Sequence, residues 1–301
     1  MPHRAMLRRP VGCPVVARGA VGAAGCSRAA GAPTARTARR RLAFFLCGVY
    51  WESLRFGAGF LALKGCAMPS WNIHIAQTEC LLSRAGAVAH VVRDCNVFLF
   101  GNLVPDIYVC YMVPDLPRRI RYTETHFADP GHMPRPRAHE FWDGYVAPLL
   151  GRVAPAGRRA AGSPEPLQTA LDLALGAWAH LLADNIWNAH SYEVLERMGE
   201  KPSDGFRIKK QADFDWFGKT LPISAVPVAT DELYRAAAEF GQYAIDRQAV
   251  DETVAVAERI VRENPGVPGH PPYRLLSDEF FERVFTEVIE ETNRQLDELL
   301  G

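Results

Sequence analysis

The sequence predicts an all-α protein with a single multi-helix domain, and three observations support this. Apolar residues recur every three or four positions along most of the chain after residue 67. Alternating runs typical of half-buried strands are nearly absent there. The helical pattern is broken mainly at residues 153–165 and 264–272, which are rich in Pro, Gly or Ala. We therefore expect one helical domain over residues 68–301, without internal repeats.

Charge divides the chain into two unlike regions. Residues 1–67 carry ten Arg and one Lys against the single acid Glu52, a net charge of +10, and the 23 basic and 33 acidic residues that follow give −10. Residues 1–40 are mostly Ala, Gly, Arg and Pro, which bury too little apolar surface to offset chain entropy. We therefore expect a largely disordered, basic N-terminal extension over residues 1–67.

Part of this extension resembles an export signal. A basic triplet at residues 39–41 precedes an apolar run at 42–51. Charged residues from Glu52 onward interrupt the apolar region before any plausible cleavage site. The interpretation we favour is that translation starts at Met68 and that the protein is cytoplasmic; export directed by residues 39–67 is the alternative.

Composition disfavours several classes of partner and site. A nucleic-acid-binding surface needs clustered Lys and Arg, whereas the predicted domain is acidic, so no nucleic acid is expected. No uncharged apolar stretch reaches the roughly 18 residues of a membrane span, so no transmembrane segment is expected. All seven Cys lie at or before Cys110 without a CxxC pair, which indicates neither a disulfide framework nor a thiolate zinc site.

Boundary signals place four helical segments. One begins at Trp71, and a long one runs from Pro166 to Gly199, since Pro favours the first turn and Gly the end of a helix. The wide apolar face of the segment from Pro166 to Gly199 predicts a central, mostly buried helix. Two more begin after Thr230 and Ser277. The last has an apolar stripe made of Phe281, Val284, Phe285, Val288, Leu296 and Leu300.

The central helix contains the clearest sign of chemistry, the segment His180-Leu-Leu-Ala-Asp184. At about 100° per residue, side chains four positions apart lie one turn from each other on one face. A helix can deliver two ligands to one metal with this spacing. Apolar neighbours such as Leu181 and Trp187 indicate that the pair is buried, and a buried charge must be paired or metal-bound. The alternative is a His–Asp hydrogen bond inside a helix bundle.

Four other side chains are candidates for the same site. His74 lies at the start of the first helix, and Asp106 follows Pro105, which restricts the chain and directs the carboxylate from a turn. His126 lies between two turn-rich segments, and His190 lies farther along the central helix, at the edge of the cluster or outside it. The alternatives are a helix N-cap for Asp106 and a solvated surface residue for His126. Surface positions are expected for His90, His132, His139 and His270.

These segments also occur in an order that is found in a known family. The quoted residues are MPSWNIH at 68–74, FLFGNLVPD at 98–106, THF at 125–127, HLLADNIWN at 180–188 and KKQADF at 209–214. Together they resemble the zinc-dependent phospholipase C family. That family belongs to an all-α superfamily shared with secreted bacterial phospholipases C and zinc-dependent single-strand-specific nucleases. The resemblance covers most of residues 68–220, and the ordered set is more specific than HxxxD alone.

The resemblance implies a zinc phosphodiesterase. Asp106, His126, His180 and Asp184 would surround one zinc, and Asp184 would bridge to a second zinc that also takes His74. The zinc ions would activate a hydroxide that attacks the phosphorus of a phospholipid or small phosphate ester, with Asp106 and Asp184 as the catalytic carboxylates. Nitrogen and carboxylate ligands without thiols suit Zn²⁺, with Mn²⁺ or Fe²⁺ as alternatives.

A third zinc site departs from the pattern of the secreted members. The secreted members complete this site with a second His and with a Glu one helical turn after it. In this chain the only His after His190 is His270, which lies in a Pro-rich segment. Asp213 and Asp215 are the alternative ligands. We therefore expect two zinc ions and an incomplete third site, with His190 as a sixth candidate ligand.

Two other functions stay open. One is a catalytically silent relative that keeps the helical scaffold as a metal-binding or interaction module. The other is a different helical metallohydrolase, such as an HD-domain phosphohydrolase, which needs adjacent His and Asp; none of the nine His is followed by Asp. The acidic domain disfavours a nuclease and an anionic membrane surface, so zwitterionic or soluble substrates fit better.

Overall fold

Helices make up all the regular secondary structure that the structure describes. The computed structural model describes residues 70–109, 112–153 and 165–300, all in one unit of the chain, and no strand occurs among them. The all-α prediction is confirmed at this level. No helix in the described ranges combines the length and the apolar character that crossing a membrane requires. The expectations for residues 1–67, and most of the predicted loop at 153–165, lie outside the described residues.

The helices begin and end close to the predicted boundaries. Thr230 and Ser277 cap the helices that follow them, because each side-chain oxygen accepts the backbone N–H three residues on. Residues 264–272 contain no helix, as predicted. In the last helix Leu300 departs from the predicted apolar stripe, since it lies at the helix end and is 42% exposed. In chain order the elements are α1 (Trp71–Ser83), α2 (Ala87–Val91), α3 (Cys95–Gly101), the 3-10 turn η1 (Val104–Asp106), α4 (Tyr122–Thr125), α5 (Ala138–Phe141), the π-helical turn η2 (Trp142–Val146), α6 (Ala147–Leu150), α7 (Glu165–Met198), α8 (Asp204–Thr220), α9 (Asp231–Ala238), α10 (Arg247–Glu263) and α11 (Asp278–Leu300).

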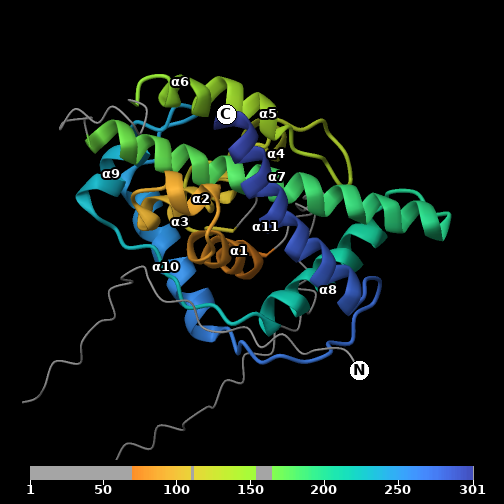
Figure 1. Cartoon of the computed structure of the whole chain (residues 1–301). Helices are drawn as coiled ribbons and strands as arrows, with labels where there is room; N and C mark the ends of the chain where they lie inside the picture. The colour runs from red at the N-terminus through yellow and green to blue at the C-terminus, as the bar shows by residue number, and fades with distance from the viewer. Residues whose placement is uncertain (1–69, 110–111, 154–164, 301) are drawn as a thin grey trace, which may run out of the picture. The chain divides into compact units, whose positions relative to one another are not determined.

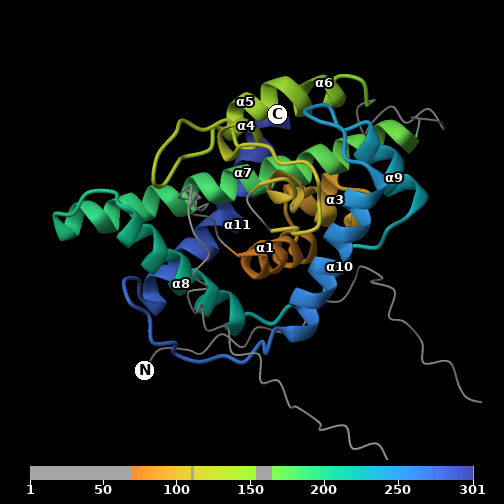
Figure 2. The ribbon, with the colours of Figure 1, turned by 180° about the vertical axis from the view of Figure 1, so that it is seen from behind.

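The long helix α7 is the element on which the others pack. α3, α5, α9 and α11 contact it, and in Figures 1 and 2 it runs between α4–α6 on one side and α1 and α3 on the other. Pro166 lies in its first turn, and Gly199, with φ of +68°, follows its last residue. Residues 171–184 are buried around the whole circumference of the helix. The prediction of a central, buried helix is therefore confirmed.

Two glycines bring the backbones of α3 and α7 into contact. A Cβ added at Gly101 would lie 2.3 Å from the carbonyl oxygen of Leu173, and one added at Gly176 would lie 2.3 Å from that of Phe98. Helix backbone cannot give way as a flexible side chain can, so only glycine fits at both positions. This contact sets the position of the next turn of α7, which carries His180.

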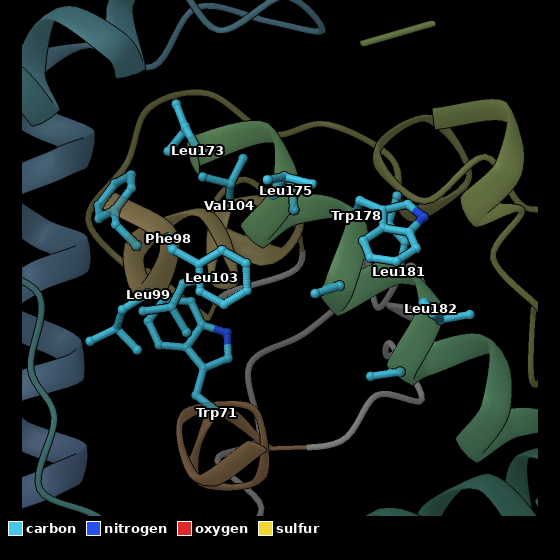
Figure 3. Packing of buried hydrophobic residues seen from close by; sticks show 14 of the residues in the cluster. Trp71, Phe98, Leu99, Leu103, Val104, Leu173, Leu175, Trp178, Leu181 and Leu182 are labelled. Carbon is cyan, nitrogen blue, oxygen red and sulfur yellow. The ribbon is translucent and has the colours of Figure 1, made fainter. Parts of the chain in front are cut away.

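An apolar cluster joins α1, α3, η1 and α7. Trp71, the first residue of α1, is fully buried, and Figure 3 shows its ring directed toward Leu99 and Leu103. Trp178 and Leu181 of α7 belong to the same cluster. An aromatic ring of this size buries roughly 150–250 Å². The cluster therefore fixes the mutual positions of α1, η1 and α7, which carry five of the six predicted site residues.

Replacing Gly176 with Ala is expected to lower the free energy of unfolding by about 3 kcal/mol, because the added methyl group must separate α3 from α7. Urea unfolding measures this change. Gly144→Ala is the matched control, since a Cβ there meets no atom within 4 Å; it should leave stability unchanged or raise it by up to about 1 kcal/mol. Equal stability of Gly176→Ala and the parent chain would contradict the close backbone contact.

Candidate metal centre

Five of the six predicted site residues meet inside the helix bundle. His74 comes from α1, Asp106 from η1, His126 from the residue after α4, and His180 and Asp184 from α7. All five side chains are 0% exposed. His74, Asp106 and His180 form one triad of potential ligands, and His126, His180 and Asp184 form another, with all ligand atoms of a triad within 4.8 Å of one another. We call these five residues the His/Asp cluster.

The distances within the cluster are close to those between ligands of one metal ion. His126 Nε2 and His180 Nε2 are 3.2 Å apart. Asp106 Oδ1 lies 3.5 and 3.7 Å from these two nitrogens, and Asp184 Oδ2 lies 3.6 and 3.8 Å from them. Ligands of one tetrahedral zinc, with bonds of about 2.0–2.2 Å, are about 3.3–3.6 Å apart. Each triangle of two nitrogens and one oxygen therefore has nearly the dimensions of one face of a tetrahedral site.

The carboxylate of Asp184 faces ligands on both sides. Its Oδ2 atom faces His126 and His180, whereas its Oδ1 atom lies 3.3 Å from His74 Nε2. The ring of His74 stacks on that of His180, with centroids 4.0 Å apart and planes at 14°. A carboxylate in this position can bridge two ions, one bound with His126 and His180 and one with His74.

Hydrogen bonds determine which ring nitrogens carry protons. His180 Nδ1 lies 2.8 Å from the carbonyl oxygen of Asn102, which only accepts, so Nδ1 is protonated. The Thr125 hydroxyl donates to the carbonyl oxygen of Tyr122 and therefore accepts from His126 Nδ1 at 2.7 Å. In both neutral rings Nε2 then carries a lone pair and no proton, so no hydrogen bond can form between the two Nε2 atoms. A cation between these nitrogens would offset their mutual repulsion, because both lone pairs could bind it.

Unpaired polar atoms also indicate a missing positive charge. Both ring nitrogens of His74, Asp106 Oδ1 and Asp184 Oδ1 are buried without a hydrogen-bond partner among the described residues. An unsatisfied buried polar group costs about 1–3 kcal/mol. Such groups in one place are accounted for if they bind an ion.

Burial shifts the pKa values of the cluster in the direction that favours a cation. It lowers the pKa of His74 and of His180 to about 3, so both imidazoles are neutral and can act as ligands. Burial also raises the pKa of Asp106 and that of Asp184, and the negative charge of Asp184 raises the pKa of Asp106 further. The carboxylate charges are therefore costly without a compensating cation, and a divalent metal fits the residues present.

Sequence reasoning missed several residues that hold the ligands in place. Trp71 Nε1 donates to Asp106 Oδ2 at 3.0 Å. The Tyr122 hydroxyl donates to Asp184 Oδ2 at 3.2 Å, and its ring stacks on His126 with centroids 3.8 Å apart. The hydrogen bond from Trp71 leaves Asp106 Oδ1 as the oxygen that faces the histidines, and the stacking of Tyr122 fixes the ring of His126. Trp71 lies inside a quoted segment, whereas nothing in the sequence singles out Tyr122.

Lys210 brings a buried positive charge close to Asp184. It is fully buried, and its ammonium group donates to Asn188 Oδ1. Burial lowers the pKa of Lys210 to about 8, and attraction to Asp184 opposes this shift. One sequence signal was available, because Lys210 occupies the apolar face of α8, four residues from both Phe206 and Phe214.

His190 lies outside the cluster, contrary to its prediction as a sixth ligand. Its Nδ1 and Nε2 atoms are each 2.9 Å from a carboxylate oxygen, of Glu193 and Glu287 respectively. The physical reason is its position: ten residues along α7 from His180 correspond to about 15 Å of rise and a different face of the helix.

The alternative ligands for a third site also have other roles. Asp213 accepts three backbone N–H groups, from Arg274, Leu275 and Leu276, at 2.7–2.9 Å and so holds the segment before α11. Asp215 is exposed and accepts from the side chain of Gln211. The four histidines predicted at the surface are exposed, namely His90, His132, His139 and His270.

Comparisons with protein-family models, with curated proteins and with solved structures each gave no match. The chemistry of the site therefore has to be inferred from its own residues.

Thr125→Val is expected to weaken Zn²⁺ binding about 10- to 100-fold, because the hydroxyl that orients His126 is lost while the size of the side chain is kept. Competition with a chelating dye measures this affinity. Thr253→Val is the matched control, since the Thr253 hydroxyl is also buried but has no hydrogen-bond partner among the described residues. If both variants bound Zn²⁺ as tightly as the parent chain, Thr125 would have no role in orienting a ligand.

Proposed function

We propose that this chain is a zinc-dependent phosphodiester hydrolase of the phospholipase C type. One observation carries the proposal. The Nε2 atoms of His126 and His180, each with a lone pair, lie 3.2 Å apart. One oxygen of Asp106 and one of Asp184 lie 3.5 and 3.6 Å from His126 Nε2. Three imidazoles and two carboxylates, without a thiolate, form a donor set that suits Zn²⁺. The order of these ligands along an all-α chain agrees with the family that the sequence resembles.

Two ions fit the cluster better than one. His126, His180 and one oxygen each of Asp106 and Asp184 would hold the first ion, and His74 with the other oxygen of Asp184 would hold the second. Zinc ions at such a site supply a water that is deprotonated near neutral pH and stabilise negative charge on phosphoryl oxygens. We infer that the hydrolysed bond is a phosphodiester.

The surrounding residues would keep the ligands in the form that this chemistry needs. Trp71 Nε1 donates to Asp106 Oδ2, so Asp106 Oδ1 is the oxygen that would face the metal position. Asn102 and Thr125 hold protons on the Nδ1 atoms of His180 and His126, so Nε2 is the ligand atom in both. The ammonium group of Lys210 would offset the charge of Asp184, whose pKa it lowers.

A metal-stabilised scaffold without activity is the second candidate function. The observation that favours it is burial: all five ligands are 0% exposed, and neither the hollow beside Glu193 nor the one beside Thr123 is lined by any of them. Structural zinc sites are closed in this way, whereas catalytic sites keep one position open. In that role the ions would hold α1, η1, α4 and α7 together.

Hydrolysis of bis(4-nitrophenyl) phosphate by the zinc-loaded chain tests the proposal, and zinc content should be near two per chain. His180→Ala removes a ligand of the first ion and is expected to lower the rate at least 1000-fold, in line with the contribution of metal-activated water. His190→Ala is the matched control on the same helix, since both of its ring nitrogens contact surface carboxylates, and it should retain the parent rate. Hydrolysis that survives His180→Ala would overturn the proposal.

Removing the metal separates the two candidate functions. Chelation should lower the melting temperature in either case, because an ion that binds only the folded chain at 1,000 times its dissociation constant stabilises it by about 4 kcal/mol. A hydrolase loses its rate along with this stability and recovers it on addition of Zn²⁺. A chain that is stabilised by Zn²⁺ and hydrolyses no phosphodiester is the scaffold.

A further inference from the structure

A cavity of about 360 Å³ lies beside the segment that carries His126. Its wall includes Thr123 and Phe127, on either side of His126 in the chain, and Tyr243. Tyr243 is buried, and its hydroxyl donates to the carbonyl oxygen of Val104 at 3.0 Å, two residues before the η1 ligand. The cavity and the His/Asp cluster are therefore built on the same two segments.

Arg118 provides a positive charge at this cavity. Its guanidinium carbon lies 5.1 Å from the ring centroid of Tyr108 and 5.8 Å from that of Tyr243, and Nη1 donates to the carbonyl oxygen of Ala244 at 3.2 Å. Among the described residues no carboxylate forms an ion pair with it. A guanidinium that is held by two rings and still has free N–H donors is preorganised to bind phosphate.

The other charged groups of the wall are already paired. Arg137 lies 3.2 Å from Asp129 and 2.5 Å from Glu140. Glu124 pairs with Arg121. Within the described part of the chain, Arg118 is therefore the cation at this cavity that is free to meet an anionic ligand.

Besides the polar residues Thr123 and Gln242, the rest of the wall has an apolar and aromatic part that includes Ile120, Phe127 and Tyr145. Phe127 has φ of +52°, a left-handed conformation that costs a non-glycine residue roughly 1–2 kcal/mol. In this conformation its ring contacts those of Phe141 and Tyr145, with centroids 6.0 and 6.1 Å away. Strain of this kind is retained mainly at functional sites.

We propose that this cavity is the substrate subsite of the hydrolase and that it takes a small phosphate ester with an aryl or short alkyl group. Arg118 binds the phosphate, and the aromatic wall binds the organic group. A volume of about 360 Å³ lies at the lower end for small-molecule sites, which favours such an ester over a phospholipid with two acyl chains. This inference rests on the proposed function for the reaction, but ligand binding at the cavity can be measured without it.

Calorimetric titration of the full chain with phenylphosphonate, which has a phenyl group and cannot be hydrolysed as an ester, tests the subsite. Arg118→Gln should weaken binding at least tenfold, with or without bound Zn²⁺, because charge-assisted hydrogen bonds are lost. Arg262→Gln, at an exposed position that does not line the cavity, should bind as the parent chain does. Methylphosphonate should bind several-fold more weakly than phenylphosphonate, since it lacks the ring.

The outcomes separate failure of the subsite from failure of the proposed function. Binding that is sensitive to Arg118→Gln in a chain that hydrolyses nothing supports the subsite and rejects the hydrolase. Phenylphosphonate binding that requires Zn²⁺ and is unchanged by Arg118→Gln overturns the subsite, whatever the activity. Hydrolysis of phosphatidylcholine vesicles at the rate of the small ester overturns the assignment of substrate class.

Discussion

The chain buries a group of hydrogen-bond acceptors that cannot satisfy one another, and the arrangement of its helices depends on how that cost is met. Two imidazole lone pairs and two carboxylates converge. Trp71 and Tyr122 each donate to one oxygen of a carboxylate, but among the described residues the other oxygen of each carboxylate has no donor. Removing even one charge from water costs several kcal/mol. A cation at this point would convert each of these unfavourable terms into a coordination bond. Metal binding and folding would then be linked, because the candidate ligands come from four separate segments and meet only in the folded chain.

Close backbone contacts fix the positions of the candidate ligands. Gly101 and Gly176 allow α3 and α7 to touch, and the carbonyl oxygen of Asn102, immediately after α3, then receives the Nδ1 proton of His180. The same contact therefore both packs the helices and sets the tautomer of a ligand. Trp71 acts similarly, since its ring belongs to the apolar core and its N–H holds Asp106. Supporting groups that are themselves locked by packing are what a metal site requires.

Helix geometry explains which parts of the site the sequence could predict. The i,i+4 spacing places His180 and Asp184 on one face of a helix whatever surrounds it, so this pair was identified from the residues alone. That His74, Asp106 and His126 join them depends on tertiary packing, and only the resemblance to a known family indicated it. The helical rise places His190 too far away. The role of Thr125 rests on a hydrogen bond to the backbone of the preceding turn, which leaves no pattern in the sequence.

The His126–Phe127 dipeptide connects the two candidate sites most directly. Directly after α4, His126 turns into the cluster while Phe127, in a left-handed conformation, turns into the wall of the cavity. Gln242 ties this segment to the opposite wall, since its amide donates to the carbonyl oxygens of Glu124 and Thr125. A ligand that fills the cavity would contact Phe127, which is bonded directly to His126. Both candidate sites therefore depend on the conformation of one short segment, because α4 and the two residues after it carry a member of the cluster and a member of the cavity wall.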